Sequence, residues 1–77
     1  MNKQKKLLKI GELAKQTSEL VSAIRYWTNE GLIEVKEQSQ GGYHLYDLLM
    51  VERVKEIRKL QNIDRLTIAE IKEQLNG

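Results

Sequence analysis

Polar side chains recur on one side of the segment 20–29, within the stretch TSELVSAIRYWTNEGLI. At helical spacing, the residues on this side are Ser22, Arg25, Tyr26 and Asn29. Arginine can grip a phosphate or a guanine, asparagine can pair with adenine, and hydroxyls can reach base edges or the backbone. The opposite side is apolar and consists of Leu20, Ile24 and Trp27. The spacing therefore predicts a helix that is held at its apolar back and free at its polar front.

A second short helix must precede this one and fix its direction. Apolar residues recur at helical spacing over residues 10–16, which predicts an amphipathic helix there. The next helix begins almost at once, with Ser18 as the expected N-cap and Glu19 placed favourably against the helix dipole. It runs to about Glu30, and Gly31 supplies the left-handed residue that ends it. Two helices so close in sequence must cross steeply, as in a helix-turn-helix.

After this pair of helices the apolar period changes from 3.6 to 2, which predicts a β-hairpin. Glycines 41 and 42 lie between two alternating segments and indicate an exposed turn. We expect one face of the hairpin to join the core, through Ile33, Val35 and Leu45, while Tyr46 also packs.

Two further helices are expected after the hairpin. Asp47 should cap a longer helix whose inward-facing residues are Leu48, Met50, Val51, Val54, Ile57 and Leu60. The last helix opens with a capping box made by Thr67 and Glu70, and its apolar residues are Ile68, Ile71 and Leu75. The predicted fold class is mainly α: a winged helix-turn-helix of four helices, with a two-stranded β-hairpin wing between helices 2 and 3.

Length and composition bound the class of protein. Seventy-seven residues make one small domain, 1–77, in which we expect residues 1–7 to form a flexible basic tail. The absence of cysteine excludes disulfides and thiolate metal sites, and no apolar stretch is long enough to span a bilayer. We therefore expect a soluble, cytoplasmic protein that does not bind membranes. Net charge is +2 overall, but residues 1–36 hold seven basic and four acidic side chains, a net +3. Such asymmetry favours a polyanionic partner.

The residue inventory argues against catalysis. His44 is the only histidine, and no serine nucleophile or acid is paired with it in sequence. No glycine-rich phosphate loop opens a helix, and no ligands lie at metal-binding spacing. We therefore predict no catalytic residue, no metal site and no cofactor, and we expect that the protein is not an enzyme.

Binding of double-stranded DNA fits the pattern better. The major groove of B-DNA, about 12 Å wide, admits one α-helix, here the segment of about 20–29. The hairpin, at about 33–46, would be a wing on the phosphate backbone. The candidate DNA-binding residues are Lys15, Thr17, Ser22, Arg25, Tyr26, Asn29, Lys36, Gly42, Tyr43 and His44. Two plainer readings stand beside these roles: Arg25 could pair with Glu30, and His44 could simply be exposed. Trp27 is expected in the core rather than on the binding face.

Three motifs in order resemble the DNA-binding domain of MerR-type bacterial transcription regulators. They are Ile10-Gly11-Glu12-Leu13-Ala14, then Arg25-Tyr26-Trp27 followed by Gly31-Leu32-Ile33, then Gly42-Tyr43-x-x-Tyr46. The resemblance implies a winged helix-turn-helix that binds promoter or operator DNA, as a homodimer in the full-length context. It also implies that Arg25 and Tyr43 contact phosphates.

Departures from the family pattern keep other functions open. The family usually has glycine at the positions of Ser18 and Arg65, and a basic residue at those of Ser22 and His44. Because the changes at Ser22 and His44 remove positive charge from the predicted face, we expect weak or partner-assisted DNA binding by this chain alone. The alternatives are an excisionase-like or architectural DNA-bending factor, or a protein-interaction module that has lost DNA binding.

Overall fold

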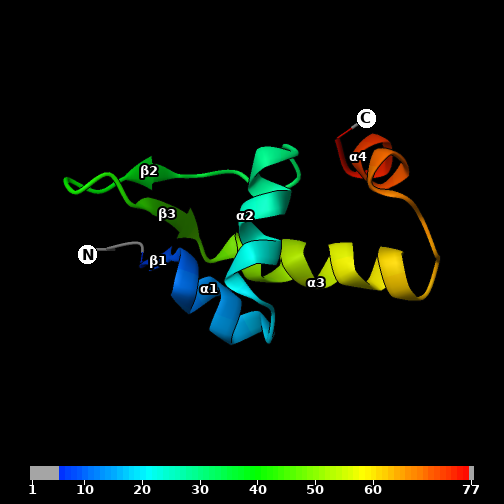
Figure 1. Cartoon of the computed structure of the whole chain (residues 1–77), viewed down its shortest axis with the longest axis horizontal. Coiled ribbons are helices and arrows are strands. Elements are labelled where there is room, and N and C mark those ends of the chain that lie inside the picture. Colours follow the sequence, from blue (N-terminus) through cyan, green and yellow to red (C-terminus); the bar gives the residue numbers. More distant parts are fainter. Residues whose placement is uncertain (1–5, 77) are drawn as a thin grey trace, which may run out of the picture.

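A computed structural model describes residues 6–76 of the chain and contains four helices and a small antiparallel sheet (Figure 1). The elements follow one another in the order β1 (Leu7–Lys9), α1 (Ile10–Thr17), α2 (Val21–Asn29), β2 (Glu37–Gln38), β3 (His44–Asp47), α3 (Leu49–Asn62) and α4 (Ile68–Asn76). The hairpin of β2 and β3 projects from the helical body, while α2 lies across α3 (Figure 1). This arrangement confirms the predicted winged helix-turn-helix, with its hairpin between the second and third helices.

The turn between α1 and α2 differs from the prediction. Ser18 adopts a left-handed conformation (φ 58°, ψ 37°) and ends α1, so its assignment as the N-cap of α2 is wrong. The amide of Ser18 donates to the Lys15 carbonyl (3.2 Å), and that of Glu19 donates to the Ala14 carbonyl (2.8 Å). These two bonds satisfy carbonyls that the end of α1 would leave free, as in a Schellman motif.

The N-cap of α2 is Leu20, and this changes its expected place in the core. Its backbone is extended (φ −82°, ψ 148°), so the side chain leaves the helical stripe. Leu20 is 74% exposed, whereas Ile24 and Trp27 are buried. The predicted apolar back of the helix is therefore correct for Ile24 and Trp27 and wrong for Leu20.

β3 is the central strand of a three-stranded sheet, because β1 pairs with its other edge. The sequence pattern predicts only two strands. In the register of β1 and β3, Leu8 lies opposite Tyr46, and both side chains are buried. Leu45, expected in the core, points to the other side of the pleat and is only half-buried, because strand side chains alternate. The strand begins at Leu7, so the prediction of a flexible tail is wrong for this residue; residues 1–5 of that predicted tail lie outside the described residues.

The core lies where α3 meets α1, α2 and the sheet, and α3 contributes Val54, Ile57 and Leu60 to it. Leu48 is 46% exposed rather than inward-facing, because it lies at the N-cap position, outside the helical stripe. The predicted cap residue, Asp47, lies one position before this N-cap, and its carboxylate still accepts a hydrogen bond from the amide of Leu49, the first residue of α3 (3.0 Å).

The start of α4 carries the predicted capping box. The Thr67 amide donates to the Glu70 carboxylate (2.8 Å), and the Glu70 amide donates to the Thr67 hydroxyl (3.2 Å). On the apolar face of α4, Ile71 is buried in the core, and Ile68 and Leu75 are partly buried beside it. Arg65, in the preceding turn, has φ 56°, a left-handed conformation that glycine adopts with less strain.

Side chains also tie α4 to the turn that ends α2. The Arg53 guanidinium of α3 donates to the Leu32 carbonyl (Nε, 2.9 Å) and to the Asn76 side-chain oxygen (Nη2, 2.7 Å). The Asn76 amide group donates in turn to the Gly31 carbonyl (3.3 Å). The end of α2 is thus held by hydrogen bonds from two other helices.

Candidate nucleic-acid interface

A groove of about 330 Å³ separates α2 from the hairpin. We call this the wing–helix groove, and we call residues 37–47 the wing. The residues that line the groove are Lys9, Ile10, Arg25, Thr28, Asn29, Gly42, Tyr43, His44 and Tyr46. Five of the ten predicted DNA-binding residues are therefore brought together, although 13 or more positions separate the two sets in sequence. They are Arg25, Asn29, Gly42, Tyr43 and His44.

Arg25 and Asn29 lie four residues apart on α2 and therefore share one face of it. This face is exposed because Ile24 and Trp27, on the other side of the helix, are 0% and 2% exposed. Within residues 6–76, Arg25 forms neither an internal hydrogen bond nor an ion pair, so the alternative pairing with Glu30 is not observed there. Its guanidinium donors are available to a ligand.

The tip of the wing is a tight turn closed by Ser39. The Gly42 amide donates to the Ser39 carbonyl (2.9 Å), and the Tyr43 amide donates to the Ser39 hydroxyl (3.1 Å). Gly42 has φ +83°, a left-handed conformation that glycine adopts without strain. Tyr43 leaves this turn 67% exposed, with its ring against Gly41, where the β-carbon of any other residue would lie only 3.0 Å from Tyr43 Cε2.

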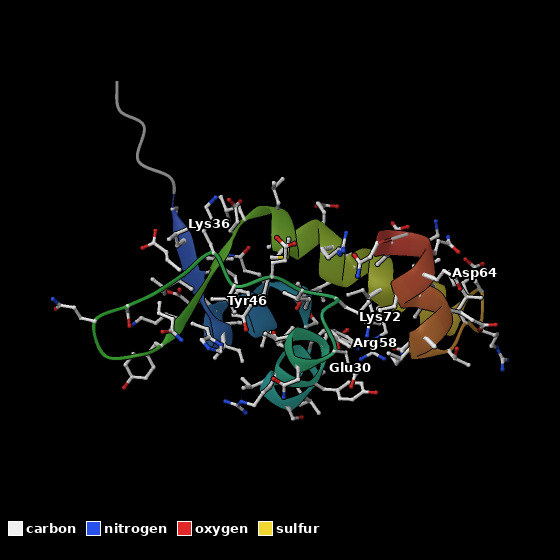
Figure 2. All side chains as sticks on the ribbon, turned by 90° about the horizontal axis from the view of Figure 1, so that it is seen from above. Glu30, Lys36, Tyr46, Arg58, Asp64 and Lys72 are labelled. Atoms are coloured by element: carbon white, nitrogen blue, oxygen red, sulfur yellow. The ribbon has the colours of Figure 1, made fainter. Side chains whose placement is uncertain are left out.

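The base of the wing is joined to α2 through a residue pair that sequence reasoning missed. The Tyr46 hydroxyl lies 2.9 Å from Thr28 Oγ1, and Thr28 Oγ1 is 2.7 Å from the Ile24 carbonyl. A threonine hydroxyl has one hydrogen, which here goes to the carbonyl, so Tyr46 donates to Thr28. Tyr46 is 0% exposed and lies in the interior of the molecule (Figure 2). This bond helps fix the angle between the wing and α2.

Other predicted site residues lie outside the groove. Ser22 and Tyr26 are exposed on α2, and Lys15 is exposed on α1. Thr17 directs its hydroxyl back to the Leu13 carbonyl (2.8 Å), and it borders a different hollow, which α3 lines with Lys55 and Lys59.

Lys36 is also separated from the groove. It lies on the side of the sheet away from α2 (Figure 2), beside Asp47 and Met50. The structure therefore does not bring Lys36 together with Arg25. Any contact of Lys36 with the same ligand would have to pass around the edge of the wing.

An ion pair attaches the turn before α2 to α3. Arg58 donates to both carboxylate oxygens of Glu19, through Nε (2.8 Å) and Nη2, and its guanidinium lies 5.1 Å from the centre of the Trp27 ring. The hydrogen bond with Glu19 raises the pKa of Arg58 above its usual value. Glu19 thus forms an ion pair with Arg58 of α3, on the side of α2 that bears the buried Trp27 ring. Its favourable interaction with the dipole of α2 stays a prediction.

Other kinds of site are not found in the part of the chain that the structure describes. No three His, Asp or Glu side chains of residues 6–76 are arranged to hold a metal ion. None of the described helices is long and apolar enough to cross a membrane.

Comparison with known proteins identifies the family. The family model described as MerR HTH family regulatory protein matches residues 8–77, which is nearly the whole chain. The chain belongs to the MerR HTH family. This membership confirms the resemblance found in the sequence motifs, and it agrees with the prediction that the chain is not an enzyme.

Similar MerR-family sequences are longer than this chain. Nodulation protein NolA of Bradyrhizobium elkanii is 33% identical over 69 residues, which are 90% of this chain and 31% of the relative. The HTH-type transcriptional regulator ZntR homolog of Haemophilus influenzae is 35% identical over 69 residues, covering 90% of this chain and 50% of the relative. The chain thus spans half or less of the length of these relatives.

Solved structures give the same result for the fold. The lead(II) complex of the transcription regulator PbrR691 from Ralstonia metallidurans CH34 matches with a TM-score of 0.79 and 36% identity, over 90% of this chain and 53% of that one. A MerR-family regulator from Bacillus cereus matches with a TM-score of 0.81 over 94% of this chain and 53% of that one; at 21% identity, it supports the fold alone.

Proposed function

We propose that this MerR-family chain binds double-stranded DNA as part of a transcription regulator, with α2 as the recognition helix in the major groove and the wing on the phosphate backbone. The observation that carries this proposal is the wing–helix groove. Arg25 and Asn29 of α2 face it from one side, and Gly42, Tyr43 and His44 of the wing face it from the other. All five residues are exposed or partly exposed.

The side chains that face the wing–helix groove support two kinds of contact with DNA. A helix with a buried back, and with an arginine on its front that has no partner among residues 6–76, can enter a major groove about 12 Å wide. Phosphates suit Arg25 and the Tyr43 hydroxyl, whereas a base edge suits Asn29, whose amide can pair with adenine. Gly42 has no side chain, so the backbone of the wing tip can approach a DNA strand closely. Lys15, Thr17, Ser22, Tyr26, Lys36 and His44 stay as further proposed contacts.

Two copies of the chain would bind the two halves of a symmetric promoter or operator site. We propose that this pairing takes place in the full-length context. A single domain has few positive charges on the proposed face, because Ser22 and His44 are not basic there. We therefore propose that one copy binds weakly and that the function is exercised in the bacterial cytoplasm, where promoters are located.

Titration of a promoter-length duplex into the chain tests the proposal. Binding should weaken as salt rises, because each phosphate contact releases a condensed counterion. Amide NMR shifts should change in α2 and at residues 39–44 and should stay constant in α4. The control is Lys72→Ala on α4, which removes one positive charge outside the proposed interface and should bind DNA as the parent chain does. Affinity that does not depend on salt, or shifts confined to α3 and α4, would contradict the proposal and favour a protein-interaction module.

A further inference from the structure

Two apolar side chains are exposed where α2 begins. Leu20 is 74% exposed and Val21 is 37% exposed. Leu20 is also the N-cap residue, a position that favours Ser, Thr, Asp or Asn because their side chains can accept a hydrogen bond from a free helix amide. No side-chain cap bond is formed by Leu20. Neither core packing nor helix capping therefore explains a leucine at this position.

The position of these residues on α2 connects them with the proposed DNA-binding face. Val21 lies four residues before Arg25, and Ser22 lies three residues before it, so all three share adjacent rows of the helix surface. In helix-turn-helix proteins, the first residues of the recognition helix are those that meet base edges. Leu20 and Val21 would therefore point at bases if α2 enters the groove.

Thymine offers the matching chemistry. Its C5 methyl group is the apolar group that a base presents in the major groove, and apolar side chains contact it. We infer that Leu20 and Val21 contact thymine methyl groups and give the domain a preference for A·T pairs at the positions that face the start of α2. This inference rests on the proposed function and adds the class of base that the start of α2 recognises.

Thymine replacement tests the inference. Duplexes are first selected from a random-sequence pool by the 77-residue chain, and each thymine of the selected site is then replaced by deoxyuridine, which lacks only the methyl group. At one or two positions, the replacement should weaken binding by about fourfold per buried methyl. Leu20→Ser and Val21→Ser should each lose the discrimination at the thymine that the replaced side chain contacts, and the double variant should bind the two forms of the duplex with equal affinity.

The variants separate loss of contact from loss of fold. Leu20→Ser supplies the missing N-cap oxygen, so the fold should be at least as stable as that of the parent chain. Leu49→Ser is the matched control: Leu49 is 70% exposed at the start of α3, outside the proposed DNA-binding face, and its loss should leave thymine discrimination intact.

The possible outcomes distinguish failure of the thymine contact from failure of the proposed DNA-binding function. Selected duplexes that bind equally with thymine and deoxyuridine at every position would overturn the inference and leave the proposed function standing. Discrimination that persists in the double variant of Leu20→Ser and Val21→Ser would overturn it as well. A pool from which no duplex is enriched, even at low salt, would overturn the proposed function and this inference with it.

Discussion

The Tyr46 hydroxyl donates a hydrogen bond to Thr28 Oγ1 at 2.9 Å, which joins the central strand of the sheet to the middle of α2. The two residues are 18 positions apart in sequence, and Tyr46 is fully buried. The bond crosses the floor of the wing–helix groove, because both residues line it. This buried hydroxyl therefore helps to fix the relative position of wing and helix.

Tyr46→Phe should remove this bond and keep the ring in the core. Thr28 would still donate to the Ile24 carbonyl, so no buried donor is left without a partner. We expect a loss of about 1 kcal/mol in the free energy of unfolding, measured by urea denaturation. Tyr43→Phe is the control, since that residue is exposed, and it should leave stability unchanged. Equal stability of Tyr46→Phe and the parent would show that the bond contributes nothing.

Arg25→Ala should weaken DNA binding without loss of fold, because the side chain is exposed and makes no internal bond within residues 6–76. If Arg25 contacts a phosphate, all sequences should weaken about equally and the salt slope should fall by about one. If it contacts a guanine, the loss of binding free energy should be about 1–3 kcal/mol, and the sequence preference at one base position should become weaker. Fluorescence anisotropy at several salt concentrations measures both. An unfolded variant would instead mean that Arg25 is structural.

Trp27→Ala should destabilise the domain by about 3–5 kcal/mol, the usual cost of truncating a buried aromatic side chain. Trp27 is 2% exposed and also lies under the Arg58 guanidinium, so the substitution removes a stacking partner as well. Thermal melting followed by circular dichroism measures the effect. A variant that stays equally stable but no longer binds DNA would place Trp27 on the binding face instead.

The substitution Arg58→Lys tests how much the two hydrogen bonds from Arg58 to the Glu19 carboxylate stabilise the fold. Lysine keeps the charge but cannot donate to both carboxylate oxygens in the same planar geometry. We therefore expect the free energy of unfolding to fall by about 1 kcal/mol. The folded-state pKa of Arg58 is raised, so its stabilising contribution is complete at every pH below the pKa of an unfolded arginine and is lost only as pH rises through the higher folded-state pKa. The stability difference between the parent chain and the Arg58→Lys variant should therefore not change between about pH 6 and 9 on account of the arginine. A difference that disappears within this range would contradict this account.

Ser18→Gly and Arg65→Gly should each leave stability unchanged or raise it by up to about 1 kcal/mol. Both residues have positive φ, 58° and 56°, which strains a side chain with a β-carbon and does not strain glycine. Part of that gain is offset by the greater freedom of glycine in the unfolded chain. Gly31→Ala is the opposite case, since φ is +82°, and it should destabilise. Chemical denaturation of the three variants side by side provides the measurement. A large loss of stability in Ser18→Gly would show that the backbone of Ser18 is not strained.

The helices and their buried faces were predictable because each repeats its signal over several turns. Ile24, Trp27, Ile57 and Ile71 all occupy predicted apolar positions and are buried. The short strand β1 was not predictable in the same way. It has three residues, and its partner β3 lies far along the chain, with Leu7 opposite Asp47, so no local pattern indicates the pairing.

The ends of α1 and α2 show the limit of capping signals. Ser18 is a good N-cap by residue type, yet the chain uses it as the left-handed residue that ends the preceding helix. The choice depends on how the two helices pack, and not on Ser18 alone. The candidate site was predicted as two separate segments, the front of α2 and the wing. Their convergence on one groove, and the Thr28–Tyr46 bond beneath it, required the three-dimensional arrangement.

Asn76 gives the last turn of α4 a mechanical role. Its side chain accepts from Arg53 and donates to the carbonyl of Gly31, the residue that ends α2. The last turn of α4 is therefore linked to the end of α2 through this side chain, so a displacement of that turn would act on α2 at Gly31.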